Sequence, residues 1–196
     1  MTGDGIGRLL VVSLHQSIGE VLPARLEYYE HWLTPMGLKD GRSGLAPLGA
    51  VLSFLRREGE TSYTAVMRTA GELSAEWHHA HERTGGRLLG WLPRRLRARV
   101  VLRRSRGLLR AAFQPLDVKV RSHRGDGVVT LTHSVFCTLR EPWPWPTCAY
   151  FAGALGKYFA LHGLDADVSL SNCQAQGAGH CTLTLTLAST TKSEPA

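Results

Sequence analysis

Residues 148–187 read CAYFAGALGKYFALHGLDADVSLSNCQAQGAGHCTLTLTL, and they carry the clearest secondary-structure pattern in the chain. Apolar and small residues recur at helical spacing over 148–162, where Thr147 can cap the helix and Gly163 can end it. Polar and apolar residues then alternate over 166–173 and over 181–187, on either side of a loop at 174–180. The segment therefore predicts a helix followed by a β-hairpin.

A second hairpin is predicted just upstream. The period of two in Leu116, Val118 and Val120 indicates a strand, and the Gly-Asp-Gly sequence within 124–127 indicates a turn. The strand after this turn is expected to carry five residues on one face: Val129, Leu131, His133, Val135 and Cys137. The alternating prolines of 142–146 exclude a central strand in that stretch.

The N-terminal part of the chain has helical periodicity instead. Helices are predicted over 6–22, 24–33, 48–55 and 61–82, and as one or two amphipathic helices over 92–113. Residues 35–44 are expected to form a loop. This order predicts one α+β domain over 1–188, with N-terminal helices packed on a small antiparallel sheet formed by the hairpins of 116–188. A disordered tail is expected over 189–196.

The composition of the 196-residue chain is that of a folded protein. It is 43% hydrophobic and 20% charged, which allows a sizeable core and excludes a fibrous or wholly disordered chain. The best apolar stretch, 149–161, is too short for a membrane span and contains Lys157. No secretory cleavage site is recognisable, so we expect a cytoplasmic protein. Four widely spaced cysteines indicate thiols or metal ligands rather than a disulfide framework.

The formal charge of +7 comes from one segment. Between Glu82 and Asp117 there are ten arginines and no acidic residue, whereas the rest of the chain is close to neutral. We expect this segment to bind an anion, either nucleic acid or a membrane surface, through Arg94, Arg95, Arg103, Arg104 and Arg106. The alternative is that acidic patches elsewhere, or on a second copy of the chain, neutralise it.

Six residues of the C-terminal segment carry a family resemblance: Cys148, Tyr150, Gly153, Cys173, Gly177 and Cys181. Their order resembles that of the 4-vinyl-reductase (V-four-R) domain family, whose fold is shared with small subunits of the transport-protein-particle tethering complex. The matched segment is about a fifth of the chain. The resemblance implies an α+β ligand-binding module, often a homodimer, found in sensors of small aromatic or hydrocarbon ligands and in a tetrapyrrole-pathway protein.

The resemblance also implies a metal site. In metal-binding members of the family, the ligands are the three matched cysteines and a Glu three residues before the first hairpin cysteine, where this chain has Leu170. Cys137 is the candidate for the fourth ligand beside Cys148, Cys173 and Cys181. Zinc suits four thiolates, and an iron–sulfur cluster suits them as well. The remaining interpretation is four buried thiols without a metal.

Aromatic residues are available to line an apolar, ligand-sized cavity between the 61–82 helix, the 148–162 helix and the sheet. The candidates for ligand contact are Trp77, Phe136, Trp143, Tyr150 and Phe151. Trp143 and Trp145 form either a lid or an ordinary loop packed on the sheet. The small residues of the 148–162 helix, such as Gly153, serve close helix packing or contact with a flat ligand.

A histidine-rich run over 76–82 could place His78 beside His81 or Glu82 for a metal or haem contact, with a polar helix face as the alternative.

Three functions are compatible with these patterns. The first is a sensor or carrier domain for a hydrophobic, aromatic or tetrapyrrole-like small molecule, with a cysteine metal site. The second is a tetrapyrrole-pathway enzyme of the 4-vinyl-reductase type. The chain lacks any Gly-x-Gly-x-x-Gly sequence after a predicted strand, which argues against reductase chemistry of its own. The third is an interaction or tethering protein that uses the arginine-rich segment. Catalytic residues cannot be identified from spacing.

Overall fold

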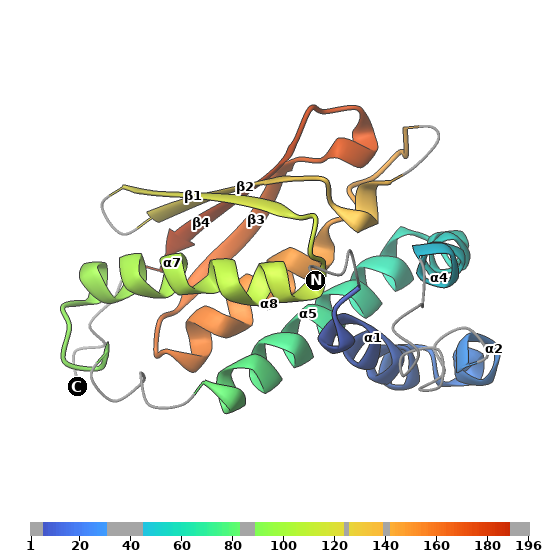
Figure 1. Cartoon of the computed structure of the whole chain (residues 1–196), viewed down its shortest axis with the longest axis horizontal. Coiled ribbons are helices and arrows are strands. Elements are labelled where there is room, and N and C mark those ends of the chain that lie inside the picture. Colours follow the sequence, from blue (N-terminus) through green and yellow to red (C-terminus); the bar gives the residue numbers. More distant parts are fainter. Residues whose placement is uncertain (1–5, 31–44, 83–88, 124–125, 139–141, 189–196) are drawn as a thin grey trace, which may run out of the picture.

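The computed structural model describes residues 6–30, 45–82, 89–123, 126–138 and 142–188, and it has the predicted α+β architecture (Figure 1). The described helices are α1 (Arg8–Val21), α2 (Leu26–Glu30), α4 (Leu45–Arg57), α5 (Glu60–His81), α7 (Arg94–Ala112) and α8 (Ala149–Leu161). The strands are β1 (Asp117–His123), β2 (Asp126–Thr132), β3 (Ala166–Asn172) and β4 (Cys181–Leu187). Short 3-10 helices occur at η1 (Pro23–Arg25), η2 (Val135–Cys137) and η3 (Gln174–Gln176).

The four strands form one antiparallel sheet in the order β1-β2-β4-β3. The two predicted hairpins are joined through the pairing of β2 with β4, in which Leu131 lies opposite Cys181. Val129, Leu131 and Leu183 are buried on the face that meets the helices, whereas the residues that alternate with them are exposed or half-buried. This register brings the start of β4 next to the end of β2.

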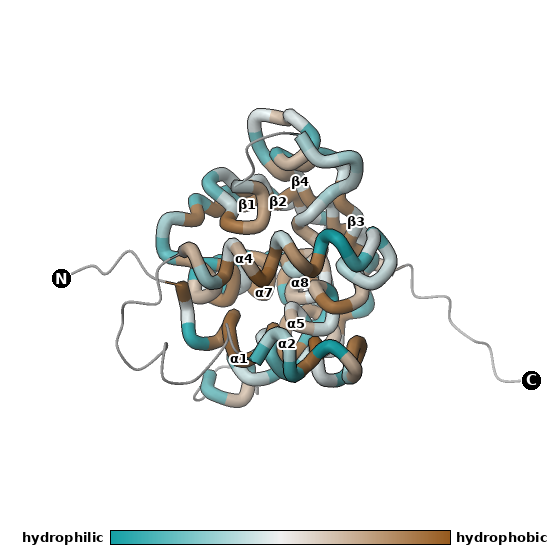
Figure 2. The backbone as a smooth tube through the Cα atoms, turned by 90° about the vertical axis from the view of Figure 1, so that its right-hand side faces the viewer, coloured by the Kyte–Doolittle hydropathy of each residue, from teal (hydrophilic) through white to brown (hydrophobic). Residues whose placement is uncertain are grey.

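Helices cover one face of the sheet in two layers (Figure 1). Helices α7 and α8 lie directly beneath the strands, α5 packs beneath α8, and α1 packs against α5. One side of α7 faces the core and the other faces solvent, because Val101, Leu102 and Leu109 are buried whereas Arg99 and Arg103 are exposed. Figure 2, seen from the side, shows α4 lying across the front of the molecule with both hydrophobic and hydrophilic residues along it. No described helix has the length and apolar character needed to cross a membrane.

Helices α5 and α8 touch at their backbones. A Cβ atom at Gly71 would lie 2.0 Å from the carbonyl oxygen of Tyr150, and a Cβ atom at Gly153 would lie 2.3 Å from that of Arg68. Both distances are shorter than any normal contact, so glycine is required on each helix. Of the two interpretations of the small residues of α8, close helix packing is therefore confirmed at Gly153.

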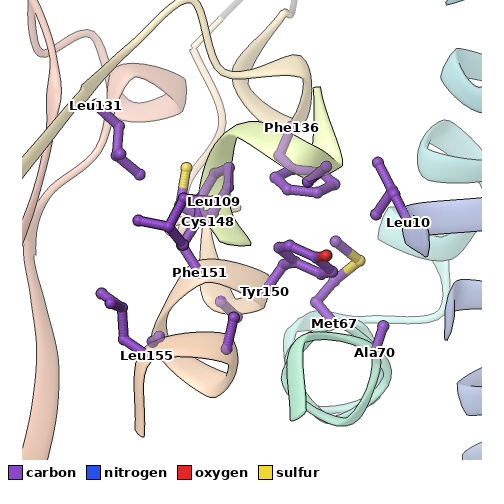
Figure 3. Packing of buried hydrophobic residues seen from close by; sticks show 14 of the residues in the cluster. Leu10, Met67, Ala70, Leu109, Leu131, Phe136, Cys148, Tyr150, Phe151 and Leu155 are labelled. Carbon is purple, nitrogen blue, oxygen red and sulfur yellow. The ribbon is translucent and has the colours of Figure 1, made fainter. Parts of the chain in front are cut away.

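The core lies between these layers (Figure 3). In the close-up, Leu10 of α1, Met67 of α5 and Tyr150 of α8 point toward one another, with Phe136 above them. The buried Tyr150 hydroxyl donates a hydrogen bond to Ser74 Oγ at 2.8 Å, which is itself 2.8 Å from Ser13 Oγ. This chain of hydroxyls satisfies the polar end of Tyr150 inside an apolar region.

Two local predictions are wrong. The strand expected to continue to Cys137 ends at Thr132, because His133 adopts a left-handed φ of 61° and the chain turns into η2. Thr147 does not cap α8, because its hydroxyl donates to the carbonyl oxygen of Phe136 at 2.8 Å. The expected loop at 35–44, part of the expected turn at 124–127 and the expected tail at 189–196 lie outside the described residues.

Candidate functional site

The four cysteines of the chain meet at the end of the sheet, beside the start of α8. Cys137 is the last residue of η2, Cys148 precedes the first residue of α8, Cys173 follows β3, and Cys181 begins β4. The shortest Sγ–Sγ separation is 3.1 Å, between Cys137 and Cys148. Four further separations are 3.3–4.0 Å, and all four sulfurs lie within 4.8 Å of one another. The structure thus brings together every cysteine that the sequence proposed as a ligand.

Local backbone features place these sulfurs. The β3–β4 pairing shifts register between Leu170 and Asn172, and η3 then turns the chain back. Gly177 ends that turn with a φ of 89°, which other residues rarely adopt. These irregularities allow Cys173 and Cys181 to lie on the same side of the hairpin, facing the start of α8.

The spacing of the sulfurs fits a single tetrahedral ion. Zn–S bonds of about 2.3 Å place four tetrahedral sulfurs about 3.8 Å apart, which falls within the observed range. In a four-iron cluster each thiolate binds a different iron, so its four sulfurs are spread further apart than the ligands of one ion. The arrangement therefore suits one metal ion better than a cluster.

Hydrogen-bond donors surround the sulfurs. The backbone N–H of Thr147 donates to Cys173 Sγ at 3.4 Å, and that of Gln174 donates to Cys181 Sγ at 3.3 Å. The Ser134 hydroxyl lies 3.5 Å from Cys148 Sγ. Donors in these positions spread the negative charge of thiolates and orient them toward a metal.

The cysteines are sheltered from water: Cys148, Cys173 and Cys181 are buried, and Cys137 is half-buried. Burial raises the pKa of the Cys148 thiol well above its usual range. Hydrogen bonds from Cys137 and the other two thiols lower the pKa of Cys173. The hydrogen bond with Cys148 likewise lowers the pKa of Cys137.

Sequence reasoning missed Arg56, which is 4% exposed near the end of α4. Its Nη2 donates to the carbonyl oxygen of Phe136 at 3.0 Å, one residue before Cys137. None of the ion pairs between described residues includes Arg56, although a buried charge ordinarily requires a partner. The signal available in the sequence was a basic residue directly after the buried Leu55.

The candidate ligand-binding aromatics fall into three places. Phe136, Tyr150 and Phe151 are fully buried and in mutual ring contact, with centroids 5.2–5.4 Å apart. Trp143 packs on Trp145 at 5.2 Å. Trp77 is half-buried near the far end of α5. The structure thus brings three of the five together, directly beside Cys148.

A groove of about 290 Å³ lies between α5, α8 and β3, where a cavity was expected. It is open, and its wall carries Arg68, Glu72, Lys157 and Asp167 beside small residues rather than aromatic ones. An apolar enclosed cavity lined by Tyr150 and its neighbours stays a prediction.

The arginines of α7 form an exposed stripe. Arg95, Arg99, Arg103, Arg106 and Arg110 recur at helical spacing and are all exposed. Arg110 pairs with Asp117 at 3.9 Å, and no ion pair between described residues involves the other four. Arg94 differs, because its guanidinium donates to the carbonyl oxygen of Ala188.

Comparisons with known proteins establish the fold. No family profile and no curated protein matches the chain. A trafficking protein particle complex subunit 3 from Naegleria fowleri, solved covalently bound to palmitic acid, has a TM-score of 0.55 at 8% identity and covers 74% of this chain and 93% of its own. An H-NOX protein mutant from K. algicida, solved as unliganded Fe(II), has a TM-score of 0.55 at 10% identity and covers 96% of this chain and 100% of its own.

The phenol-responsive sensory domain of the transcription activator PoxR, solved with phenol, has a TM-score of 0.48 at 20% identity. It covers 72% of this chain and 73% of its own.

Proposed function

We propose that this chain is a small-molecule sensor or carrier domain built around one zinc ion, held by Cys137, Cys148, Cys173 and Cys181. The observation that carries the proposal is the convergence of four sulfurs to within 4.8 Å from four separate segments. Bound zinc would join η2, the start of α8 and both strands of the last hairpin. It would act as a structural ion, because all four tetrahedral positions are taken by protein ligands.

The surroundings of the cysteines support four thiolates bound to one Zn²⁺. Four thiolates and one Zn²⁺ carry a net charge of −2, which needs compensation inside a protein. The guanidinium of Arg56 is buried beside the carbonyl of Phe136 and lacks a carboxylate partner among the described residues. The anionic metal centre supplies the partner that this buried cation otherwise lacks.

The ligand we propose is a small hydrophobic or aromatic molecule beside the metal centre. Phe136, Tyr150 and Phe151 would supply the apolar surface, and Trp77 and Trp143 are further candidates for ligand contact. A neighbour of the same fold was solved with covalently bound palmitic acid, which supports an apolar occupant. A tetrapyrrole-pathway reductase activity, a homodimer and a cytoplasmic location stay predictions.

Native mass spectrometry of freshly purified protein, paired with metal analysis, tests this proposal. We expect about one zinc per chain and an additional mass of a few hundred daltons or less that organic solvent extracts. Protein without metal and without extractable ligand, with a melting temperature unchanged by chelator, would overturn it.

A second function, anion binding by α7, is favoured by the exposed arginine stripe. Changing Arg95, Arg99 and Arg103 together to Glu should abolish binding to anionic vesicles or duplex DNA, whereas Lys at the same positions should largely retain it. Affinity for both probes that is unchanged in the Glu variant would reject this function.

A further inference from the structure

A second cluster of metal-ligating atoms lies at the other end of α8. Helices α5 and α8 run in the same direction (Figure 1), as the contacts of Gly71 with Tyr150, of Glu76 with Lys157 and of Glu82 with Tyr158 show. Their C-terminal ends therefore converge. His79 and Glu82 come from the end of α5, and His162 directly follows α8.

Three potential ligand atoms meet there: a ring nitrogen of His79, a carboxylate oxygen of Glu82 and a ring nitrogen of His162 all lie within 4.8 Å of one another. The two imidazole rings are in edge contact, with centroids 4.8 Å apart. His78, which the sequence paired with Glu82, lies 3.6 Å from the same carboxylate. His81 turns away, with its Nδ1 2.6 Å from the carbonyl oxygen of Trp77.

The hydrogen bonds around His162 fix the role of its two nitrogens. Its Nδ1 lies 2.9 Å from the carbonyl oxygen of Tyr158, which can only accept, so Nδ1 carries the hydrogen. The Nε2 atom is left with a lone pair, and it is shielded from solvent without a partner among the described residues. A backbone carbonyl that holds the distal N–H in this way is typical of metal-binding histidines.

His79 and Glu82 complete the set. His79 Nδ1 is also shielded and has no hydrogen-bond partner among the described residues, and its 3.8 Å distance to Glu82 Oε2 is too long for a hydrogen bond. The Tyr158 hydroxyl donates to Glu82 Oε1 at 2.8 Å and holds the carboxylate in place. Two shielded nitrogens and one oriented carboxylate thus lie within reach of one metal ion, and no described residue forms a hydrogen bond with either nitrogen.

Some charges near His79, Glu82 and His162 favour a bound cation, and others oppose it. The C-terminal ends of α5 and α8 each present partial negative charge, which favours a cation. Arg104 of α7 also acts electrostatically on His162, and its positive charge opposes a cation. The carboxylate of Glu82 offsets it.

We propose that His79, Glu82 and His162 form a second metal site, separate from the cysteine centre, for a divalent first-row transition-metal ion such as Zn²⁺ or Co²⁺. Two imidazoles and one carboxylate are the donor set that these ions bind with one or more positions open. Those open positions would be available to water or to a small molecule with a donor atom. The 13-residue helix α8 separates the two sites by about 20 Å along its axis.

Cobalt titration of protein whose cysteine centre is already filled with zinc tests the site. We expect one equivalent of Co²⁺ to bind, with weak visible bands and without the thiolate-to-cobalt charge-transfer absorption that a cysteine site would give. Glu82→Gln and His162→Ala should each lower the affinity about tenfold or more, and exposed His123→Ala, the matched control, should leave it unchanged. Arg104→Gln should raise it.

Glu82→Gln keeps an oxygen acceptor for the Tyr158 hydroxyl, so it tests the site even where His162→Ala fails to fold. The proposal is overturned by absence of cobalt binding, by charge-transfer absorption alone, or by full affinity in a folded Glu82→Gln variant. Failure of this site and failure of the cysteine centre can be distinguished, because histidine and carboxylate ligands give weak cobalt bands whereas thiolates give charge-transfer absorption.

Discussion

Cys137 is the residue that distinguishes a complete metal centre from three buried thiols. Its Sγ lies within 3.5 Å of each of the other three sulfurs. In the proposed ligand set it takes the place that the family resemblance gives to a Glu, three residues before the first hairpin cysteine, where this chain has Leu170. The backbone turn at His133 is what delivers it there.

Cys137→Ser should release most of the zinc and lower the melting temperature. Metal affinity is coupled to folding, and a loss of about 2 kcal/mol would shift the melting temperature of a chain of this size by about 4–8 °C. Metal analysis and thermal unfolding measure the two effects. Ser169→Ala, which removes an exposed hydroxyl of β3 away from the cysteines, is the control and should retain zinc. Full zinc content in Cys137→Ser would remove this residue from the ligand set.

Arg56→Met should destabilise the zinc-bound protein by about 1–3 kcal/mol, because it removes the buried positive charge and one of the two hydrogen bonds that the Phe136 carbonyl accepts, the other coming from the Thr147 hydroxyl. In zinc-free protein the loss should be smaller, since the unpaired charge is removed as well. Urea unfolding with and without chelator measures both values. Arg57→Met, at the exposed adjacent position, should have little effect in either state. Equal losses of stability with and without zinc would show that Arg56 does not compensate the charge of a metal centre.

The sequence predicted the candidate site at the level of single residues only in part. All four cysteines could be proposed because thiolates are recognisable ligands at known positions relative to strands and helices. Arg56 and the backbone N–H of Thr147 could not, because their roles depend on contacts with Phe136 and Cys173, which are distant in sequence. His162 was missed for the same reason, since its partners are on another helix.

At the scale of elements, the contact between α5 and α8 positions both candidate sites, since Cys148 precedes α8 and His162 follows it. The two glycines at the crossing let the helix backbones touch. This contact fixes how the two helices lie against each other. It thereby sets the position of Tyr158 on α8 relative to Glu82 at the end of α5.

Gly153→Ala should destabilise the protein by about 1–3 kcal/mol, because the new methyl group would meet the backbone oxygen of Arg68 at 2.3 Å and force the helices apart. Gly156→Ala is the matched control on the same helix. Its nearest neighbour would be Val168 Cγ2 at 3.9 Å, so it should be neutral or stabilise the helix by up to about 1 kcal/mol. Chemical denaturation compares them, and equal stability of the two variants would contradict the close crossing.

Periodicity predicted most elements well, because α8, β3 and β4 have strong patterns that end within a residue or so of the observed bounds. It failed after β2, where apolar residues continue at a period of two but the chain does not continue as a strand. There the left-handed His133 and the contacts of Cys137 outweigh the local pattern.

At the scale of the whole molecule, the cysteine cluster lies where the start of α8 meets the end of the sheet. The α+β order could be predicted from the change of period after residue 115. The pairing of β2 with β4, which joins the hairpins into one sheet, could not, since it is set by tertiary contacts. A metal at this junction would link the sheet to α8, and through Phe136 and Arg56 to α4.

X-ray absorption at the zinc edge, on protein loaded with one equivalent of zinc, tests the central claim most directly. The account predicts a first shell of four sulfurs at about 2.3 Å and no neighbouring metal. A shell dominated by nitrogen or oxygen at about 2.0–2.1 Å, or failure to retain zinc at all, would contradict it.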